Sequence, residues 1–131
     1  MTFNESDIAN LAYNVCKDLG VDWPHDERVL DTLVTTIRHT IEDVESTDII
    51  SLDRYIDYVM DNETHDYVIY NGPIVMSFYH YGLWGTDYEE RHRGQFDSML
   101  NDIMAMVNDF YSDVVIETAR HVWDDIKEEE E

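Results

Sequence analysis

Acidic residues at helical spacing are the residues of this chain whose type and pattern could do chemistry. If residues 87–127 form a helix that turns about 100° per residue, its carboxylates gather within roughly 100° of one another on one side. The members of this C-terminal carboxylate row are Asp102, Asp109, Asp113, Glu117, Asp124 and Glu128. The row is about 39 Å long, and a four-residue step of about 6 Å is close to two phosphate steps of a DNA strand. A rigid helix could therefore present the row as a substitute for phosphates.

Two earlier segments carry shorter acidic rows. Segment 24–44 has acidic residues on a face of its own, away from its apolar positions, and segment 52–62 has them at every fourth residue from Asp53. The carboxylates that we predict to imitate phosphates are Asp102, Asp109, Asp113, Glu117, Asp124, Asp125, Asp31, Glu42, Asp53 and Asp57.

An ordinary solvent-facing surface is the alternative interpretation of these rows. Exposed helix faces are commonly acidic, but they usually mix Glu with Lys at this spacing, because like charges four residues apart are unfavourable. The C-terminal row contains no basic residue, and Lys17 and Lys127 are the only lysines of the chain. This contrast favours a functional polyanionic surface, while adaptation to high salt stays open as a further alternative.

Helices are the elements that must hold these rows. Apolar residues recur at helical spacing over 5–19, 22–44, 52–62 and 87–127, with Gly20 ending the first segment and Ser51 capping the third. The pattern predicts a mainly all-α, compact domain of about four to five helices with a long acidic C-terminal helix, which could break or bend near Gly94 or near Tyr111 and Ser112. Segment 67–85 is ambiguous, since residues 74–84 fit either a buried helix or an extended run. We expect one domain over 1–131, with 128–131 as a disordered acidic tail.

The overall charge excludes several classes of function. Thirty acidic and eight basic residues give a net charge of −22, yet hydrophobic residues make up 44% and aromatic residues 12% of the chain. Such a chain can bury a core, so disorder is not expected. Its charge is repelled by nucleic acid and by anionic lipid, so we expect neither direct nucleic-acid binding nor membrane association. The single cysteine and the absence of a signal-peptide pattern predict a cytoplasmic protein.

The uncharged stretch 67–86 is rich in aromatic residues. Because aromatic side chains and Met are enriched at protein interfaces, the stretch is a candidate surface for a homodimer. Its candidate residues are Met76, Phe78, Tyr79, Tyr81 and Trp84. The alternative is a buried core segment.

Metal binding and catalysis have weaker signals. Glu117 and His121 are spaced for one helix face, but no paired Glu-x-x-His, no His-Glu-x-x-His and no cysteine cluster is present. We therefore expect no metal, no cofactor and no catalytic residue, and we interpret Cys16 as a small core residue. Residues 89–93 form a mixed cluster of acidic and basic side chains, which we interpret as a local ion-pair site.

The chain is small, acidic and poor in lysine, it is predicted to be helical, and its final helix runs into the glutamates of residues 122–131 (VWDDIKEEEE). In these features it resembles phage-encoded anti-restriction proteins of the Ocr type. Short stretches at 1–4 (MTFN), 11–13 (LAY) and 55–60 (YIDYVM) are similar to the N-terminal half of that family, whereas the aromatic stretch and residues 91–93 depart from it. The resemblance implies a helical homodimer, shaped and charged like bent B-form DNA. It would occupy the DNA channel of a type I restriction-modification enzyme or another defence enzyme, without catalysis.

The sequence thus predicts a non-enzymatic inhibitor that mimics DNA. One alternative is an immunity or antitoxin protein against a specific basic nuclease, which would depend on a compact set of aromatic anchors. A small enzyme or metal-binding domain and an ordinary domain of a halophile are the remaining alternatives.

Overall fold

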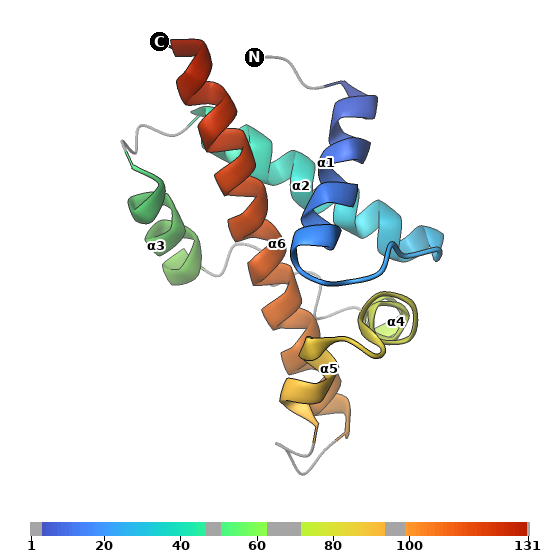
Figure 1. Ribbon diagram of the computed structural model, residues 1–131. Coiled ribbons are helices and arrows are strands. Elements are labelled where there is room, and N and C mark those ends of the chain that lie inside the picture. The colour runs from blue at the N-terminus through green and yellow to red at the C-terminus, as the bar shows by residue number, and fades with distance from the viewer. Residues whose placement is uncertain (1–3, 47–50, 63–71, 94–98, 131) are drawn as a thin grey trace.

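Helices are the regular elements of the structure, a computed structural model that describes residues 4–46, 51–62, 72–93 and 99–130. No strand occurs within these ranges, which confirms the all-α prediction. The long helix α6 (Met99–Glu130) crosses the middle of the molecule (Figure 1), and it contacts every other helix in these ranges. None of the helices in these ranges has the length and apolar composition needed to cross a membrane.

Helix α6 is central because it is apolar around more than half of its circumference. Its 32 residues extend about 48 Å. The buried side chains along it are Ile103, Met106, Val107, Phe110, Tyr111, Val114, Val115, Thr118, Ala119 and Val122. The helix is unbroken at Tyr111, where the sequence had allowed a bend, and it continues through Glu130. The tail that we expected to be disordered over 128–131 is therefore helical as far as the structure describes it.

The predicted helix 87–127 is divided in two. Helix α5 (Asp87–His92) ends where Arg93 adopts an extended backbone, with φ −66° and ψ 120°. The chain then returns as α6, and residues 94–98 lie outside the described ranges. This division lets α5 pack against α6, so that the two parts of one predicted helix become neighbours.

Helix α1 (Glu5–Asp18) has well-defined signals at both ends. Asn4 accepts a hydrogen bond from the backbone N–H of Asp7 at 2.9 Å, and the Asp7 carboxylate accepts one from the Asn4 N–H at 3.1 Å, which is a capping box. At the other end Gly20 has a φ of 70°, which favours glycine, and the Val21 N–H donates to the Cys16 carbonyl at 3.0 Å.

Replacing the capping residue tests this local argument. We expect Asn4→Ala to lower the free energy of unfolding by about 1 kcal/mol, because it leaves first-turn N–H groups without their side-chain acceptor. Urea unfolding followed by circular dichroism measures the change. Asn10→Ala is the matched control, since Asn10 is exposed in the middle of α1 and alanine is the better helix former. An equal loss in both variants would contradict the capping assignment.

Helices α2 (Glu27–Ser46) and α3 (Leu52–Asn62) begin at side-chain caps. Helix α2 begins later than residues 22–24, because the Asp26 carboxylate accepts from the backbone N–H groups of Arg28 at 2.9 Å and Val29 at 3.3 Å. The Arg28 guanidinium, bonded to the same carboxylate, holds the pKa of Asp26 below its ordinary value. The Ser51 hydroxyl accepts from the Arg54 N–H at 3.3 Å, which confirms the cap predicted for α3.

The described part of the ambiguous stretch 67–85 is a helix that is buried on one side and exposed on the other. Helix α4 (Gly72–Ser77) passes into the π-helix η2 (Phe78–Leu83), and residues 67–71 lie outside the described ranges. A Cβ atom built on Gly82 would lie 3.5 Å from Cγ1 of Val29, an ordinary van der Waals distance, so η2 packs against α2 at this position. The extended alternative for residues 74–84 is therefore wrong.

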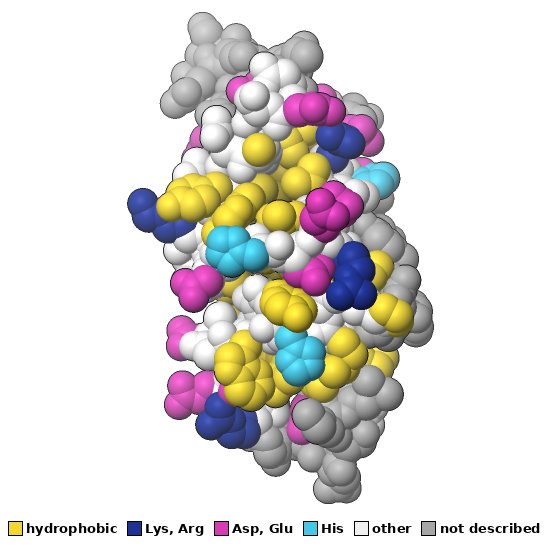
Figure 2. Space-filling view, turned by 90° about the vertical axis from the view of Figure 1, so that its right-hand side faces the viewer, with side chains coloured by type: hydrophobic (Ala, Val, Ile, Leu, Met, Phe, Trp, Pro, Cys, Tyr) yellow, Lys and Arg dark blue, Asp and Glu magenta, His cyan; other side chains and the backbone are white. Residues whose placement is uncertain are grey.

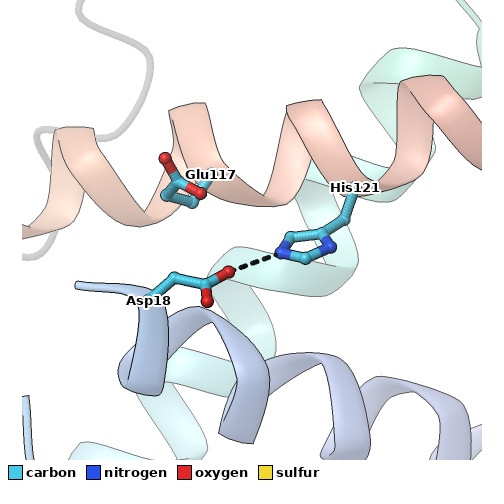
Figure 3. A group of neighbouring side chains, drawn as sticks. All are labelled: Asp18, Glu117 and His121. Atoms are coloured by element: carbon cyan, nitrogen blue, oxygen red, sulfur yellow. Dashed lines mark hydrogen bonds and ion pairs between the residues drawn. The ribbon is translucent and has the colours of Figure 1, made fainter. Parts of the chain in front are cut away.

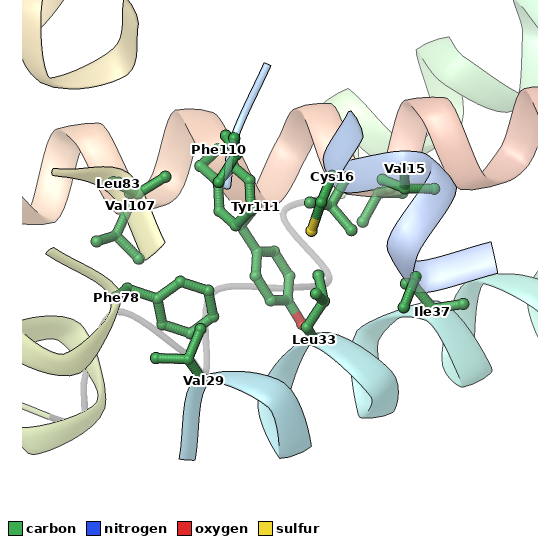
Figure 4. Packing of buried hydrophobic residues seen from close by; sticks show 14 of the residues in the cluster. Val15, Cys16, Val29, Leu33, Ile37, Phe78, Leu83, Val107, Phe110 and Tyr111 are labelled. Atoms are coloured by element: carbon green, nitrogen blue, oxygen red, sulfur yellow. The ribbon is translucent and has the colours of Figure 1, made fainter. Parts of the chain in front are cut away.

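One core joins α1, α2, η2 and α6 (Figure 4). The Phe78 and Phe110 rings lie 5.8 Å apart between centroids, and Leu33 and Ile37 of α2 are almost fully buried in the same cluster. Cys16 is 1% exposed, and burial raises the pKa of its thiol to about 12. At neutral pH the thiol is protonated and inert, in agreement with its prediction as a small core residue.

Candidate acidic surface

The middle of the C-terminal carboxylate row faces other helices. The Asp113 carboxylate accepts a hydrogen bond from the Tyr88 hydroxyl of α5 at 2.5 Å. Asp109 lies 2.7 Å from Nε2 of His92 and 3.7 Å from the Arg91 guanidinium, both on α5. These carboxylates hold α5 on α6, so they do not form the free row that we predicted.

The remaining members of the C-terminal carboxylate row differ in their burial and in their partners. Glu117 is partly buried and pairs with Arg120 on the same helix at 2.6 Å, so the row does have a basic neighbour. Asp102 is partly buried, and its Oδ1 atom has no hydrogen-bond partner within the described ranges. Asp124 is exposed. The side chains of Asp125 and Glu128 lie outside what the structure describes. The carboxylates of the row thus lie in different local environments and do not form one continuous exposed surface.

Among the carboxylates that we predicted to imitate phosphates, those that the structure describes as exposed lie mainly on α2 and α3. The four residues that we ranked after the C-terminal row, Asp31, Glu42, Asp53 and Asp57, are all exposed. On α2, a row of exposed carboxylates falls within about 60° of arc and extends about 27 Å at the rise of an α-helix. The members of this α2 row are Glu27, Asp31, Glu42 and Glu45. Arg38 shares the arc, so the row is acidic with one basic interruption.

Helix α5 carries an ion-pair cluster, as residues 89–93 predicted. Glu89 is 8% exposed, and its carboxylate accepts from the Gly85 backbone N–H at 2.6 Å and from the Arg93 guanidinium. The Gly85 hydrogen bond, followed by Arg93, lowers the pKa of Glu89. Burial, together with the Asp113 carboxylate, raises the pKa of Tyr88 far above its ordinary value. The cluster is local and intramolecular, and it positions α5.

The Glu89 contacts give a pH-dependent prediction. Because its pKa is lowered in the folded state, Glu89 stabilises the fold above the ordinary pKa of a glutamate, and this contribution is lost as the pH falls through the lowered value. We expect Glu89→Gln to be less stable than the parent by about 2 kcal/mol at pH 7, the magnitude typical of hydrogen bonds to a charged group. Chemical unfolding at pH 7 and at pH 3.5 should show this difference shrinking in acid. A difference that is constant with pH would contradict the assignment.

Asp18, Glu117 and His121 form a group of metal-type ligands between α1 and α6 (Figure 3). One ligand atom from each residue lies within 4.8 Å of the others, and Nε2 of His121 is 2.9 Å from Oδ2 of Asp18. Carboxylates and imidazole are ligands that Zn²⁺ accepts. The one-turn spacing of Glu117 and His121 was visible in the sequence, but Asp18 is 103 residues away from His121 and no local pattern could have added it. In this structure the group joins the two helices through a His–Asp contact.

One face of the molecule carries many hydrophobic side chains among its charged ones (Figure 2). On the side of α1 and α4, hydrophobic and histidine side chains gather in the middle, and charged side chains lie scattered among and around them. Tyr13, Tyr81 and Trp84 are the large hydrophobic residues exposed by more than half among those described, at 53%, 58% and 60%. The acidic surface is therefore not uniform over the molecule.

The predicted dimer residues do not share one surface. Phe78 is 1% exposed and packs on Phe110, so its place in a dimer interface was wrong: it belongs to the core of a single chain. Met76 and Tyr79 are partly buried against the core. Tyr81 and Trp84 remain as exposed candidates.

A cavity of about 260 Å³ opens where η2, α5 and the start of α6 meet. Tyr79 and Trp84 contribute aromatic rings to its lining, and Ile103 and Met106 contribute apolar side chains. Its polar lining includes His92 and Asp102. No sequence pattern indicated this cavity, because its lining comes from three separate elements.

Comparisons with models of protein families, with curated proteins and with solved structures find no match to this chain. Its function must therefore be argued from its own residues.

Proposed function

We propose that this protein is a non-enzymatic inhibitor that mimics duplex DNA and occupies the DNA-binding channel of a bacterial defence enzyme, such as a type I restriction-modification enzyme. The exposed α2 row is the observation that carries the proposal. Its carboxylates span about 27 Å on one rigid helix, a length that covers about eight phosphate steps of a DNA strand. We place the protein in the bacterial cytoplasm, where such a target acts on DNA.

The charge balance supports this proposal. Several basic residues are engaged inside the molecule: Arg28, Arg91, Arg93 and Arg120 each pair with a carboxylate of the same chain. Most of the negative charge is thus left for a partner to neutralise. A channel lined by Lys and Arg gains fast association from such a surface, and its binding weakens as salt rises.

Competition with DNA tests the proposal. Immobilised protein should capture its target from a bacterial lysate, and both salt and duplex DNA should elute that target. In a direct assay, the protein should displace labelled duplex from a purified type I restriction-modification enzyme, with a potency that falls steeply between 50 mM and 200 mM salt. Capture of a target that duplex DNA cannot elute would contradict mimicry.

An immunity protein against one basic nuclease is the second candidate. The exposure of Tyr81 and Trp84 favours it, because immunity-type interfaces depend on aromatic anchors. In that case a Tyr81→Ser/Trp84→Ser double variant would lose its partner, whereas neutralised carboxylates would mainly slow association. The same double variant tests the homodimer that we propose, through its mass in sedimentation equilibrium.

A further inference from the structure

The cavity between η2, α5 and α6 has two features that point to a ligand. The first is an aromatic wall. The Tyr79 and Trp84 rings meet edge to face, with centroids 5.1 Å apart and planes at 89°. Trp84 is nevertheless 60% exposed, so a large part of its surface faces solvent at the cavity. Such a wall favours a flat or cationic group.

The second feature is a pair of acceptors without donors. Within the part of the chain that the structure describes, Nδ1 of His92 and Oδ1 of Asp102 are buried and lack a hydrogen-bond partner. His92 is 8% exposed, and its Nε2 already faces the Asp109 carboxylate at 2.7 Å. When Nε2 carries the proton, Nδ1 is an acceptor, like Oδ1 of Asp102. Buried acceptors of this kind are costly unless a donor reaches them.

We propose that this cavity binds a guanidinium group, as presented by an arginine side chain of a partner protein. A guanidinium is planar, carries five N–H donors and has no acceptor, so it matches two acceptors beside an aromatic wall. The surrounding charge of −22 favours a cation, and Asp102 supplies a formal counter-charge in the lining. A lysine ammonium has the charge but lacks the planar shape that stacks on Trp84.

The basic residue of the lining does not oppose this assignment. Arg93 is bound to the Glu89 carboxylate, and its side chain is 72% exposed, so its charge is compensated and directed to the solvent side of the cavity. Glu89 is also engaged, through Gly85 and Arg93. His92 and Asp102 thus each contribute to the lining a buried atom that is left to bind a ligand.

The source of the arginine rests on the proposed function, because a channel that binds DNA is rich in arginine. The cavity itself can be tested without any target. Failure of the titration below would leave the DNA-mimic proposal standing, and failure of DNA competition would leave the cavity standing. Together, the exposed carboxylates and the cavity would give the protein a distributed acidic surface and one specific binding site for an arginine of the partner.

Titration with N-acetyl-arginine methylamide in 150 mM salt tests the cavity. The indole N–H signal of Trp84 in an NMR spectrum should shift and saturate, while those of Trp23 and Trp123 serve as internal references. The citrulline analogue, which is neutral, should not bind, and the lysine analogue should bind more weakly. We expect Asp102→Asn to raise the Kd about tenfold or more, as for the loss of a charge-assisted hydrogen bond. Asp57→Asn, which removes an exposed carboxylate of α3, should leave the Kd within about twofold.

A second variant keeps the test valid if Asp102→Asn fails to fold. Trp84→Leu replaces a mostly exposed side chain and should abolish saturable binding, followed through the methyl signal of Met106. Tyr81→Leu, which alters an exposed aromatic residue outside the described lining, should bind like the parent. Equal affinity for the arginine and lysine probes, with equal shifts of all three indoles, would overturn the proposal in favour of diffuse cation condensation. A Kd that changes with protein concentration would place the site between two copies of the chain.

Discussion

Neutralising four exposed carboxylates of α2 and α3 is expected to weaken binding to a DNA-binding channel by about thirtyfold. The variant combines Asp31→Asn, Glu42→Gln, Asp53→Asn and Asp57→Asn, which keep the size of each side chain. Exposed ion pairs each contribute about 0.5 kcal/mol, so four of them contribute about 2 kcal/mol. Displacement of labelled duplex from a type I restriction-modification enzyme at low salt measures the loss. Each single substitution should change the affinity by less than about threefold, because the charge is distributed.

A matched control variant shows whether the loss of affinity depends on the position of the carboxylates or on the net charge of the protein. This control variant removes the same number of charges from exposed positions outside α2 and α3. It combines Glu5→Gln, Asp22→Asn, Asp87→Asn and Glu90→Gln. This control should retain most of its affinity if the α2 row and α3 contact the channel. Equal losses in the two variants would show that net charge alone drives association. Loss of binding through one carboxylate, with the others dispensable, would contradict distributed mimicry.

Truncating the aromatic centre of the core is expected to have the largest effect on stability. Phe110 is 1% exposed, and its ring contacts those of Phe78 at 5.8 Å and Tyr88 at 5.5 Å between centroids. We expect Phe110→Ala to lower the free energy of unfolding by about 3–5 kcal/mol, a large share of the roughly 5–15 kcal/mol typical of a domain. Urea unfolding measures this loss of free energy.

The exposed aromatic residue Tyr81 is the control for this substitution. Tyr81 is 58% exposed, so Tyr81→Ala should cost less than about 1 kcal/mol. Hydrogen exchange should also show faster exchange in α5 of the Phe110 variant, because Tyr88 loses its aromatic neighbour. A loss below about 1 kcal/mol for Phe110→Ala would contradict the central position of this ring.

Helical periodicity predicted the elements well, because apolar spacing and capping residues act locally. Helix α1 matches the segment predicted from Glu5 to Leu19 within one residue, and α3 has its predicted bounds of Leu52 and Asn62. Which carboxylates are exposed to solvent, and so free to contact a partner, was not predictable in the same way. Periodicity shows which residues share a face, but it does not show whether another helix covers that face.

The contact between α5 and α6 illustrates what was missed. Tyr88 and His92 are four residues apart on α5, and so are Asp109 and Asp113 on α6. Two pairs with the same spacing and complementary chemistry could have indicated that the helices pack side by side. The sequence allowed a break of the helix near Gly94, but it did not show that α5 would turn back to lie against α6. The cavity depended on the same separation, so it was missed as well.

The order of the helices along the chain has a consequence for synthesis. Helix α6 contacts all the other helices of the described ranges, yet it follows all of them in the sequence. While the ribosome makes the chain, α1 to α5 emerge without the surface that buries their apolar faces. Folding can therefore be completed only after residues 99–130 have left the exit tunnel, and the nascent chain must stay soluble until then. Its dense negative charge favours that solubility through self-repulsion between chains.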